Sequence, residues 1–215
     1  MLDKYFLNNI SRLFNEKNYN EVILKIEQNI KINDRPPDLT NLCAVSKLLK
    51  ANRSKDDVIS ALNDFEVYYQ KSYKNFQKIE AVSNFIATCI TNVQEFNEII
   101  PYFKKAQKLY EDCEKKIGYD RKLYSHGADL YKYTLNHYKN RKILKELINN
   151  KTDNKIVACA YGYMSNYTYD WGIKEYFDYS KKFEHYFPKH KVKNINEINY
   201  KENKKIRIGF VSKDF

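Results

Sequence analysis

The sequence predicts a mainly α-helical protein that ends on one β-strand. Glycine and proline are scarce, with 5 and 4 residues among 215, which argues against an all-β protein with many tight turns. Apolar residues make up 43% of the chain and aromatic residues 15%, which is the composition of a folded protein. Apolar residues also recur at helical spacing along almost the whole chain. The length is sufficient for one domain or two.

The first two helices are expected within residues 2–30. The apolar stripe of the first consists of Leu2, Phe6, Ile10, Leu13 and Phe14, and that of the second consists of Val22, Ile23, Ile26 and Ile30. The polar segment NEKNYNE (15–21) separates them. The second helix must end before Pro36 and Pro37, because two consecutive prolines cannot continue a helix.

The next helices repeat this arrangement. Their apolar stripes are Leu42, Val45, Leu48 and Leu49, then Val58, Ala61, Leu62, Phe65 and Tyr69, and later Phe103, Ala106, Leu109 and Tyr110. Asn52 and Arg53 break the first of these three stripes, and Ser54 is the predicted N-cap of the helix that follows. Asp57 lies in the first turn of that helix, where the positive end of the helix dipole stabilises its negative charge.

These helices contain an internal repeat. The segment LFNEKNYNEVI (13–23) aligns with LKANRSKDDVI (49–59) at a shift of 36 residues, and TNVQEFNEII (91–100) resembles a third copy. A period in the middle thirties, with two helices per unit, is similar to that of tetratricopeptide repeats. Tetratricopeptide repeats have small residues where the helices of a pair cross closely, and this chain matches that feature only at Ala61 and Ala106. Residues 1–150 are therefore predicted to form a tetratricopeptide-like solenoid.

The remaining residues continue the helical pattern before it changes. One helix is predicted from Tyr124, Ala128, Tyr131, Leu135 and Tyr138, and a short one from Ile143, Leu144, Leu147 and Ile148. A further helical segment is expected over 151–188, with Trp171, Tyr176, Phe177, Phe183 and Phe187 on its last helix. Residues 189–204 are polar and form a predicted linker. Residues 205–215 follow as a strand whose continuous apolar run is typical of a strand covered on both faces.

The ending KIRIGFVSKDF (205–215) resembles the opening strand of the catalytic region in the O-linked N-acetylglucosamine transferase family, whose pattern is roughly (K/R)-(I/L)-R-(I/V)-G-(Y/F)-V-S-x-D-F. The matching residues are Lys205, Ile206, Arg207, Ile208, Gly209, Phe210, Val211, Ser212, Asp214 and Phe215. The order of repeats, aromatic helix (171–187) and strand is also similar to that family. One element departs from it, because Ser180 stands where relatives carry a histidine.

The resemblance implies a glycosyltransferase with two Rossmann-like lobes (a GT-B fold) that bind a UDP-sugar between them. Such an enzyme transfers N-acetylglucosamine or another hexose to Ser or Thr of an acceptor protein, without a metal, and the helical repeats recognise the acceptor. The chain then looks like an N-terminal fragment, with the catalytic residues expected beyond Phe215, and the 215-residue chain alone is predicted to be inactive. Ser212 and Asp214 are candidate substrate-binding residues at the edge of the UDP-sugar crevice. Alternatively, Asp214 caps a helix and Ser212 satisfies backbone groups.

Two further function classes remain open, one suggested by the charge and one by the helical repeats. With 38 basic and 27 acidic residues, the net charge is +11, and the charges are interleaved along the chain. A solvated lysine-rich surface is expected, and nucleic acid is not the expected partner. An RNA-associated helical protein would need a basic face on the folded solenoid and a binding affinity that falls steeply with salt. The other alternative is a non-catalytic helical-repeat module for protein–protein interaction. Its groove walls and core are expected to include Tyr124, Tyr131, Tyr138, Tyr161 and Tyr163.

The cysteines, the N-terminus and the lack of a predicted membrane span favour the cytoplasm. The four cysteines, Cys43, Cys89, Cys113 and Cys159, form no CxxC pair and are expected to be free, buried thiols in a reducing compartment. The histidines, His126, His137, His185 and His190, lack metal-ligand spacing and are expected at or near the surface. No segment approaches the ~20 apolar residues of a membrane span, and the N-terminus does not resemble a signal peptide.

Overall fold

The computed structural model describes residues 4–150 together with Ala160, Tyr161, Lys174, Asp178 and Lys181. This part contains eight α-helices: α1 (Lys4–Asn15), α2 (Tyr19–Asn29), α3 (Pro37–Leu49), α4 (Lys55–Lys71), α5 (Asn75–Asn92), α6 (Ile100–Ile117), α7 (Arg121–Tyr133) and α8 (His137–Asn149). Two short 3₁₀ helices, η1 (Ile32–Asp34) and η2 (Asn97–Ile99), precede α3 and α6. The predicted mainly α-helical fold is thereby confirmed for the described residues. The predicted linker and strand, 189–215, lie outside them.

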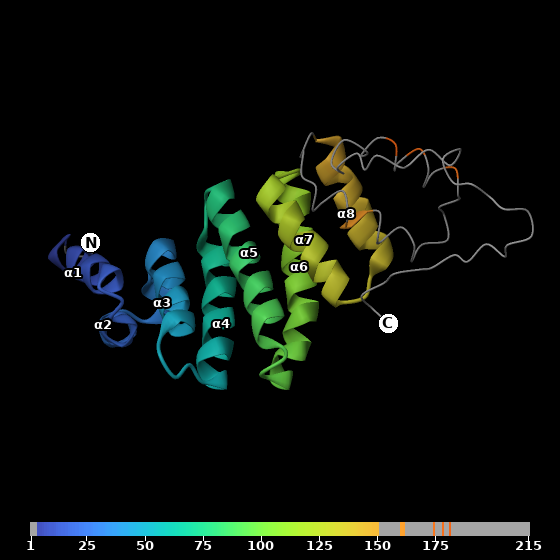
Figure 1. Cartoon of the computed structure of the whole chain (residues 1–215). Helices are drawn as coiled ribbons and strands as arrows, with labels where there is room; N and C mark the ends of the chain where they lie inside the picture. Colours follow the sequence, from blue (N-terminus) through green and yellow to red (C-terminus); the bar gives the residue numbers. More distant parts are fainter. Residues whose placement is uncertain (1–3, 151–159, 162–173, 175–177, 179–180, 182–215) are drawn as a thin grey trace, which may run out of the picture.

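The helices stand side by side in the order of the sequence, from α1 at one end to α8 at the other (Figure 1). Each packs mainly against its neighbours in sequence, and α5 also packs against α7. The two aligned segments, 13–23 and 49–59, each span the end of one helix, a turn and the start of the next. The alignment therefore found equivalent parts of two helical hairpins.

The hairpin turns follow local sequence signals. Lys17 and Asn52 adopt positive φ angles of 60° and 55°, so each turn reverses the chain within a few residues. Ser54 caps α4 as predicted: its hydroxyl accepts a hydrogen bond from the Asp57 backbone N–H at 3.2 Å. The Asp57 carboxylate accepts one from the Ser54 backbone N–H at 2.8 Å, which completes a capping box.

The prediction of one helix through Tyr124 and Tyr138 is wrong, because the chain turns between them. Leu135 has a positive φ of 57° and is 75% exposed, and Asn136 then caps α8 by accepting a hydrogen bond from the Lys139 backbone N–H at 3.1 Å. Tyr138, placed in the same stripe by sequence, is 67% exposed. The apolar residues keep a helical spacing across the turn by coincidence. Asn136, a typical N-cap residue, is the local sequence signal that a new helix begins after it.

The interior consists of two apolar clusters. The larger one runs from α3 to α8, and its largest fully buried side chains include Phe65, Tyr68, Phe85, Tyr110 and Tyr131. The smaller one lies between α1, α2 and α3 and includes Ile10, Val22 and Ile26. Ala61 and Ala106, the small residues expected at helix crossings, are both fully buried.

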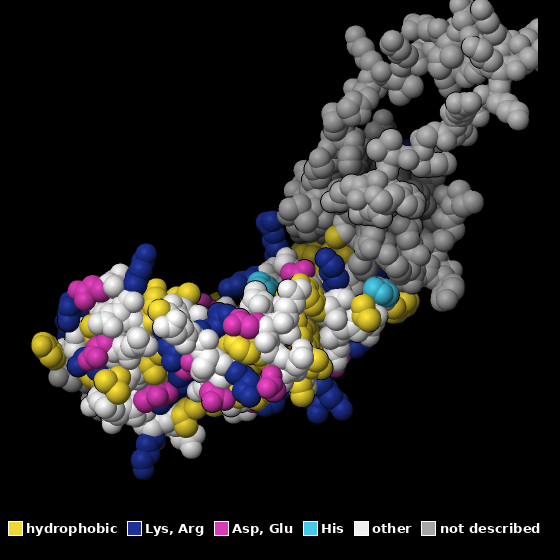
Figure 2. Space-filling model, turned by 60° about the horizontal axis from the view of Figure 1, so that its bottom comes forward, with side chains coloured by type: hydrophobic (Ala, Val, Ile, Leu, Met, Phe, Trp, Pro, Cys, Tyr) yellow, Lys and Arg dark blue, Asp and Glu magenta, His cyan; other side chains and the backbone are white. Residues whose placement is uncertain are grey.

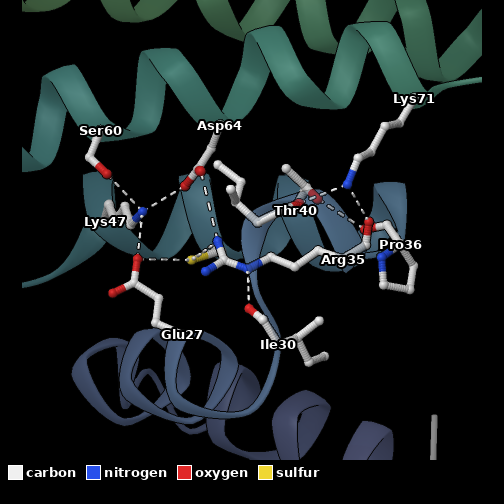
Figure 3. A network of polar contacts seen from close by, with 11 residues as sticks. Glu27, Ile30, Arg35, Pro36, Thr40, Lys47, Ser60, Asp64 and Lys71 are labelled. Carbon is white, nitrogen blue, oxygen red and sulfur yellow. Dashed lines mark hydrogen bonds and ion pairs between the residues drawn. The ribbon is translucent and has the colours of Figure 1, made fainter.

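A buried ionic network lies between α2, α3 and α4 (Figure 3). The Lys47 ammonium lies 2.7 Å from the Asp64 carboxylate, 2.8 Å from Glu27 and 2.8 Å from the Ser60 hydroxyl oxygen. Arg35 lies 3.8 Å from Asp64 and donates a hydrogen bond to the Ile30 carbonyl oxygen at 3.0 Å. Burial raises the pKa of the Asp64 carboxyl, and the cations Lys47 and Arg35 act against that shift.

The network fixes the segment between α2 and α3 against α4. Lys71 on α4 donates hydrogen bonds to the carbonyl oxygens of Ile32 and Arg35, at 2.7 and 3.0 Å. The Arg35 side chain is only 6% exposed and reaches inward from the same segment. The first helical hairpin is therefore held to the second by charged groups as well as by apolar packing.

Three of the four cysteines are free and buried, as expected: Cys43, Cys89 and Cys113. Burial raises their pKa values from 9.0 to about 11, about 12 and about 11 respectively. Cys159 lies outside the described residues.

The raised pKa values predict slow thiol chemistry in the folded chain. Because the thiolate is the reactive form, an increase of two pKa units lowers the reaction rate at pH 8 by roughly 100-fold. In a Cys159→Ser background, we expect Ellman's reagent to react slowly with the native protein and to release three equivalents rapidly after guanidinium is added. A fast-reacting thiol in the native Cys159→Ser protein would contradict the buried positions.

Candidate functional site

A groove of about 730 Å³ lies where α4, α5 and α6 meet. Its wall on α4 contains Glu66, Tyr69 and Gln70, and Lys78 contributes from α5. The wall on α6 contains Pro101, Lys104, Lys105, Lys108, Leu109, Asp112 and Lys116. The groove therefore follows most of the length of α6.

The lining of this groove is strongly basic. It contains five lysines and two acidic residues, a net charge of +3. Both acidic residues are already paired, Glu66 with Lys105 and Asp112 with Lys116, each at 2.7 Å. Lys104 and Lys108 are exposed, and neither has an ion-pair partner among the described residues. Two ammonium groups one helical turn apart are thus uncompensated on one wall.

Tyr69 forms part of the groove floor. It is 5% exposed, and its hydroxyl donates a hydrogen bond to the Asp112 carboxylate at 2.6 Å. The Lys78 ammonium lies 4.9 Å from the centre of its ring. Hydrogen bonds from Lys116 and Tyr69 lower the pKa of Asp112. At neutral pH this carboxylate is therefore ionised, and it accepts hydrogen bonds from both side chains. Burial, together with Asp112, raises the pKa of Tyr69 and keeps its hydroxyl protonated.

A second groove, of about 470 Å³, lies where α6, α7 and α8 meet. It contains three glutamates, Glu111, Glu114 and Glu146, against two lysines, so its net charge is −1. Glu111 accepts a hydrogen bond from the Tyr131 hydroxyl at 3.0 Å and pairs with Lys139 at 2.5 Å. The Lys139 hydrogen bond lowers the pKa of Glu111. The two grooves therefore differ in the sign of their charge.

The tyrosine predictions are confirmed in part. Tyr124 and Tyr131 do line the second groove, and Tyr161 is buried. Tyr138 is wrong as a core residue, because it stands exposed beside Arg141 and Lys145. Tyr163 lies outside the described residues, as do the candidate substrate-binding residues Ser212 and Asp214.

Between α2 and α4, charged side chains occupy the place that corresponds to the grooves at α4–α6 and α6–α8. There, Glu27 and Asp64 face each other across Lys47, and Arg35 completes the network (Figure 3). The hollows described above follow at α4–α6 and α6–α8. The helix array thus presents grooves of opposite charge at α4–α6 and α6–α8 and a closed ionic contact at α2–α4.

Sequence reasoning missed the lysine-lined groove, although one signal was present. Lys104, Lys105 and Lys108 share one helix, and Lys104 and Lys108 are four residues apart on the same side of it. Lys78 joins them only through the packing of α5 against α6. On the face shown in Figure 2, basic and acidic side chains are interleaved.

The described residues show no other kind of site. They contain no group of three or more His, Cys, Asp and Glu side chains that could hold a metal ion. His126 is half-buried, and its Nδ1 lies 2.9 Å from the Lys122 carbonyl oxygen. Among the described helices, none is long and apolar enough to cross a bilayer. No protein-family model matches the chain, and neither does any curated protein or any solved structure.

Proposed function

We propose that residues 4–150 form a tetratricopeptide-like arm that binds a polypeptide. The observation that carries this proposal is the row of helical hairpins with grooves between alternate helices. The spacing supports the repeat: 36 residues separate the starts of α2 and α4, and 37 separate those of α6 and α8. The interval between α4 and α6 is 45 residues, because α4 and α5, with 17 and 18 residues, are longer than α2 and α3, with 11 and 13. Elongated arrays of this kind offer extended surfaces to protein ligands.

We further propose that this arm presents acceptor proteins to a protein O-glycosyltransferase domain. The sequence KIRIGFVSKDF supports this, because its match to the opening strand of that family is nearly continuous. A strand of a parallel sheet delivers its following loop to the crevice where ligands bind, which puts Ser212 and Asp214 at the edge of a UDP-sugar site. The leaving pyrophosphate then needs helix N-termini and cations to stabilise its charge. The free, buried thiols support a cytoplasmic location.

The alternative is a non-catalytic interaction module. Glu66 and Asp112 are each engaged by a lysine and are poor candidates for general acid or base catalysis, so the groove is a binding surface under both proposals. Under this alternative the grooves bind a partner protein and no sugar is transferred. Both proposals include the binding arm. They differ in whether the motif at 205–215 is part of a glycosyltransferase domain.

The deciding experiment combines gene sequence and enzyme assay. We expect the reading frame to continue past the Phe215 codon with a histidine three residues on, and the full-length protein to release UDP from a UDP-sugar. The 215-residue chain is expected to release none, and Asp214→Asn in the full-length protein is expected to lower the rate, whereas Asp56→Asn on α4 leaves it unchanged. A stop codon directly after Phe215 would support the interaction module instead.

A further inference from the structure

We propose that the lysine-lined groove between α4 and α6 binds an extended peptide segment that carries acidic residues at alternate positions. This deepens the proposed binding arm, on which it rests, by naming the chemistry of the partner. The groove has a net charge of +3, and both of its acidic residues are already paired with lysines. Lys104 and Lys108, which have no ion-pair partner among the described residues, are therefore available to carboxylates of a ligand.

The spacing of these two lysines sets the pattern of the ligand. Side chains four residues apart on a helix are separated by about 6 Å. In an extended peptide, residues i and i+2 point to the same face and lie about 6.6 Å apart. Carboxylates at alternate positions therefore match Lys104 and Lys108, whereas adjacent carboxylates point to opposite faces.

The length of the groove sets the size of the ligand. From Pro101 to Lys116 the wall on α6 is about 22 Å long at ~1.5 Å per residue, which equals six to seven extended residues. A heptapeptide in extended conformation therefore spans both Lys104 and Lys108.

The same face disfavours nucleic acid. The groove contains no arginine, and its tyrosine is 5% exposed, so it offers neither bidentate phosphate contacts nor a stacking platform. A longer polyanion that continued toward α8 would also meet Glu111, Glu114 and Glu146 in the second groove. A short acidic segment ends before this repulsion begins.

The test is fluorescence anisotropy with two labelled heptapeptides of equal composition and charge. Glu-Ser-Glu-Ser-Glu-Ser-Glu places carboxylates at alternate positions, and Glu-Glu-Ser-Ser-Ser-Glu-Glu does not. We expect the 215-residue chain to bind the alternating peptide more tightly, with an affinity that falls as salt rises from 50 to 300 mM. The double variant Lys104→Glu/Lys108→Glu is expected to weaken binding at least tenfold.

A charge-matched control separates the groove from the net charge of the protein. Lys115→Glu/Lys122→Glu changes the net charge equally, but these exposed lysines line neither groove, so binding should stay within twofold. If the groove reversal lowers the helical circular dichroism, Lys104→Gln/Lys108→Gln replaces it, with an expected loss of at least threefold.

Several outcomes would overturn the groove assignment. These are equal losses in the two double variants, equal affinity for the two peptides, no binding of the alternating peptide at 50 mM salt, and tighter binding of pentauridylate. UDP release by the full-length protein is independent of the groove lysines. Its persistence in the absence of peptide binding would overturn this inference alone, and its absence would count against the glycosyltransferase proposal alone.

Discussion

Replacing Asp64 by Asn is expected to lower the free energy of unfolding by about 3–5 kcal/mol, the usual cost of removing one partner from a buried ion pair. The Asp64 side chain is 2% exposed and lies between the ammonium of Lys47 and the guanidinium of Arg35. Asn keeps the shape but removes the negative charge, so two buried cations lose their shared partner. Since domains of this size are stable by about 5–15 kcal/mol, the midpoint of urea unfolding should fall steeply.

Glu27 provides the matched control for Asp64. It pairs with the same Lys47 at 2.8 Å, but its side chain is 43% exposed, so water screens the interaction. Glu27→Gln is expected to cost at most about 1 kcal/mol. In a double-mutant cycle, Lys47→Met and Asp64→Asn should couple by about 0.5–3 kcal/mol, because each removes the partner of the other. Similar losses for Glu27→Gln and Asp64→Asn would show that burial does not govern this network.

The sequence signals for this network were visible but incomplete. Asp64 stands inside the apolar stripe of α4, between Leu62 and Phe65, and Lys47 stands in the apolar part of α3. A charged residue in such a stripe indicates a buried partner of opposite sign. Which partner it meets depends on how the helices pack, and only the structure brings Arg35, Lys47 and Asp64 together.

Periodicity predicted the helices with one apolar face and failed for α5. This helix packs against α4, α6 and α7, and its buried residues lie on several sides of it. They include polar side chains, such as Gln77, Ser83 and Thr88, beside the apolar Phe85 and Ile86. A helix that is buried over most of its circumference has no narrow apolar stripe for a periodicity search to detect. The grooves were missed for a related reason, since the charged residues of the first come from three helices and those of the second from two.

Replacing Gly127 by Val should also destabilise the fold, by about 1–3 kcal/mol, through overpacking between α6 and α7. A Cβ atom at this position would lie 2.3 Å from Cε2 of Tyr110, far inside contact distance. Tyr110 is 1% exposed, and its ring packs edge-on against Tyr131 at 5.7 Å and near Tyr124 at 6.5 Å. The ring therefore has little room to move aside, and the better helix propensity of Val offsets only a few tenths of a kcal/mol.

Shortening Tyr110 tests whether this single contact is the cause. In a Tyr110→Leu background, Gly127→Val should cost less by about 1 kcal/mol, because the atoms that clash with the added methyl groups are gone. Thermal unfolding of the four proteins in the cycle gives the coupling directly. If Gly127→Val costs the same in both backgrounds, its effect does not come from Tyr110. If the coupling is found, the Tyr110 ring limits the size of the side chain that α7 can carry at position 127, beside the second groove, which Tyr110 also lines.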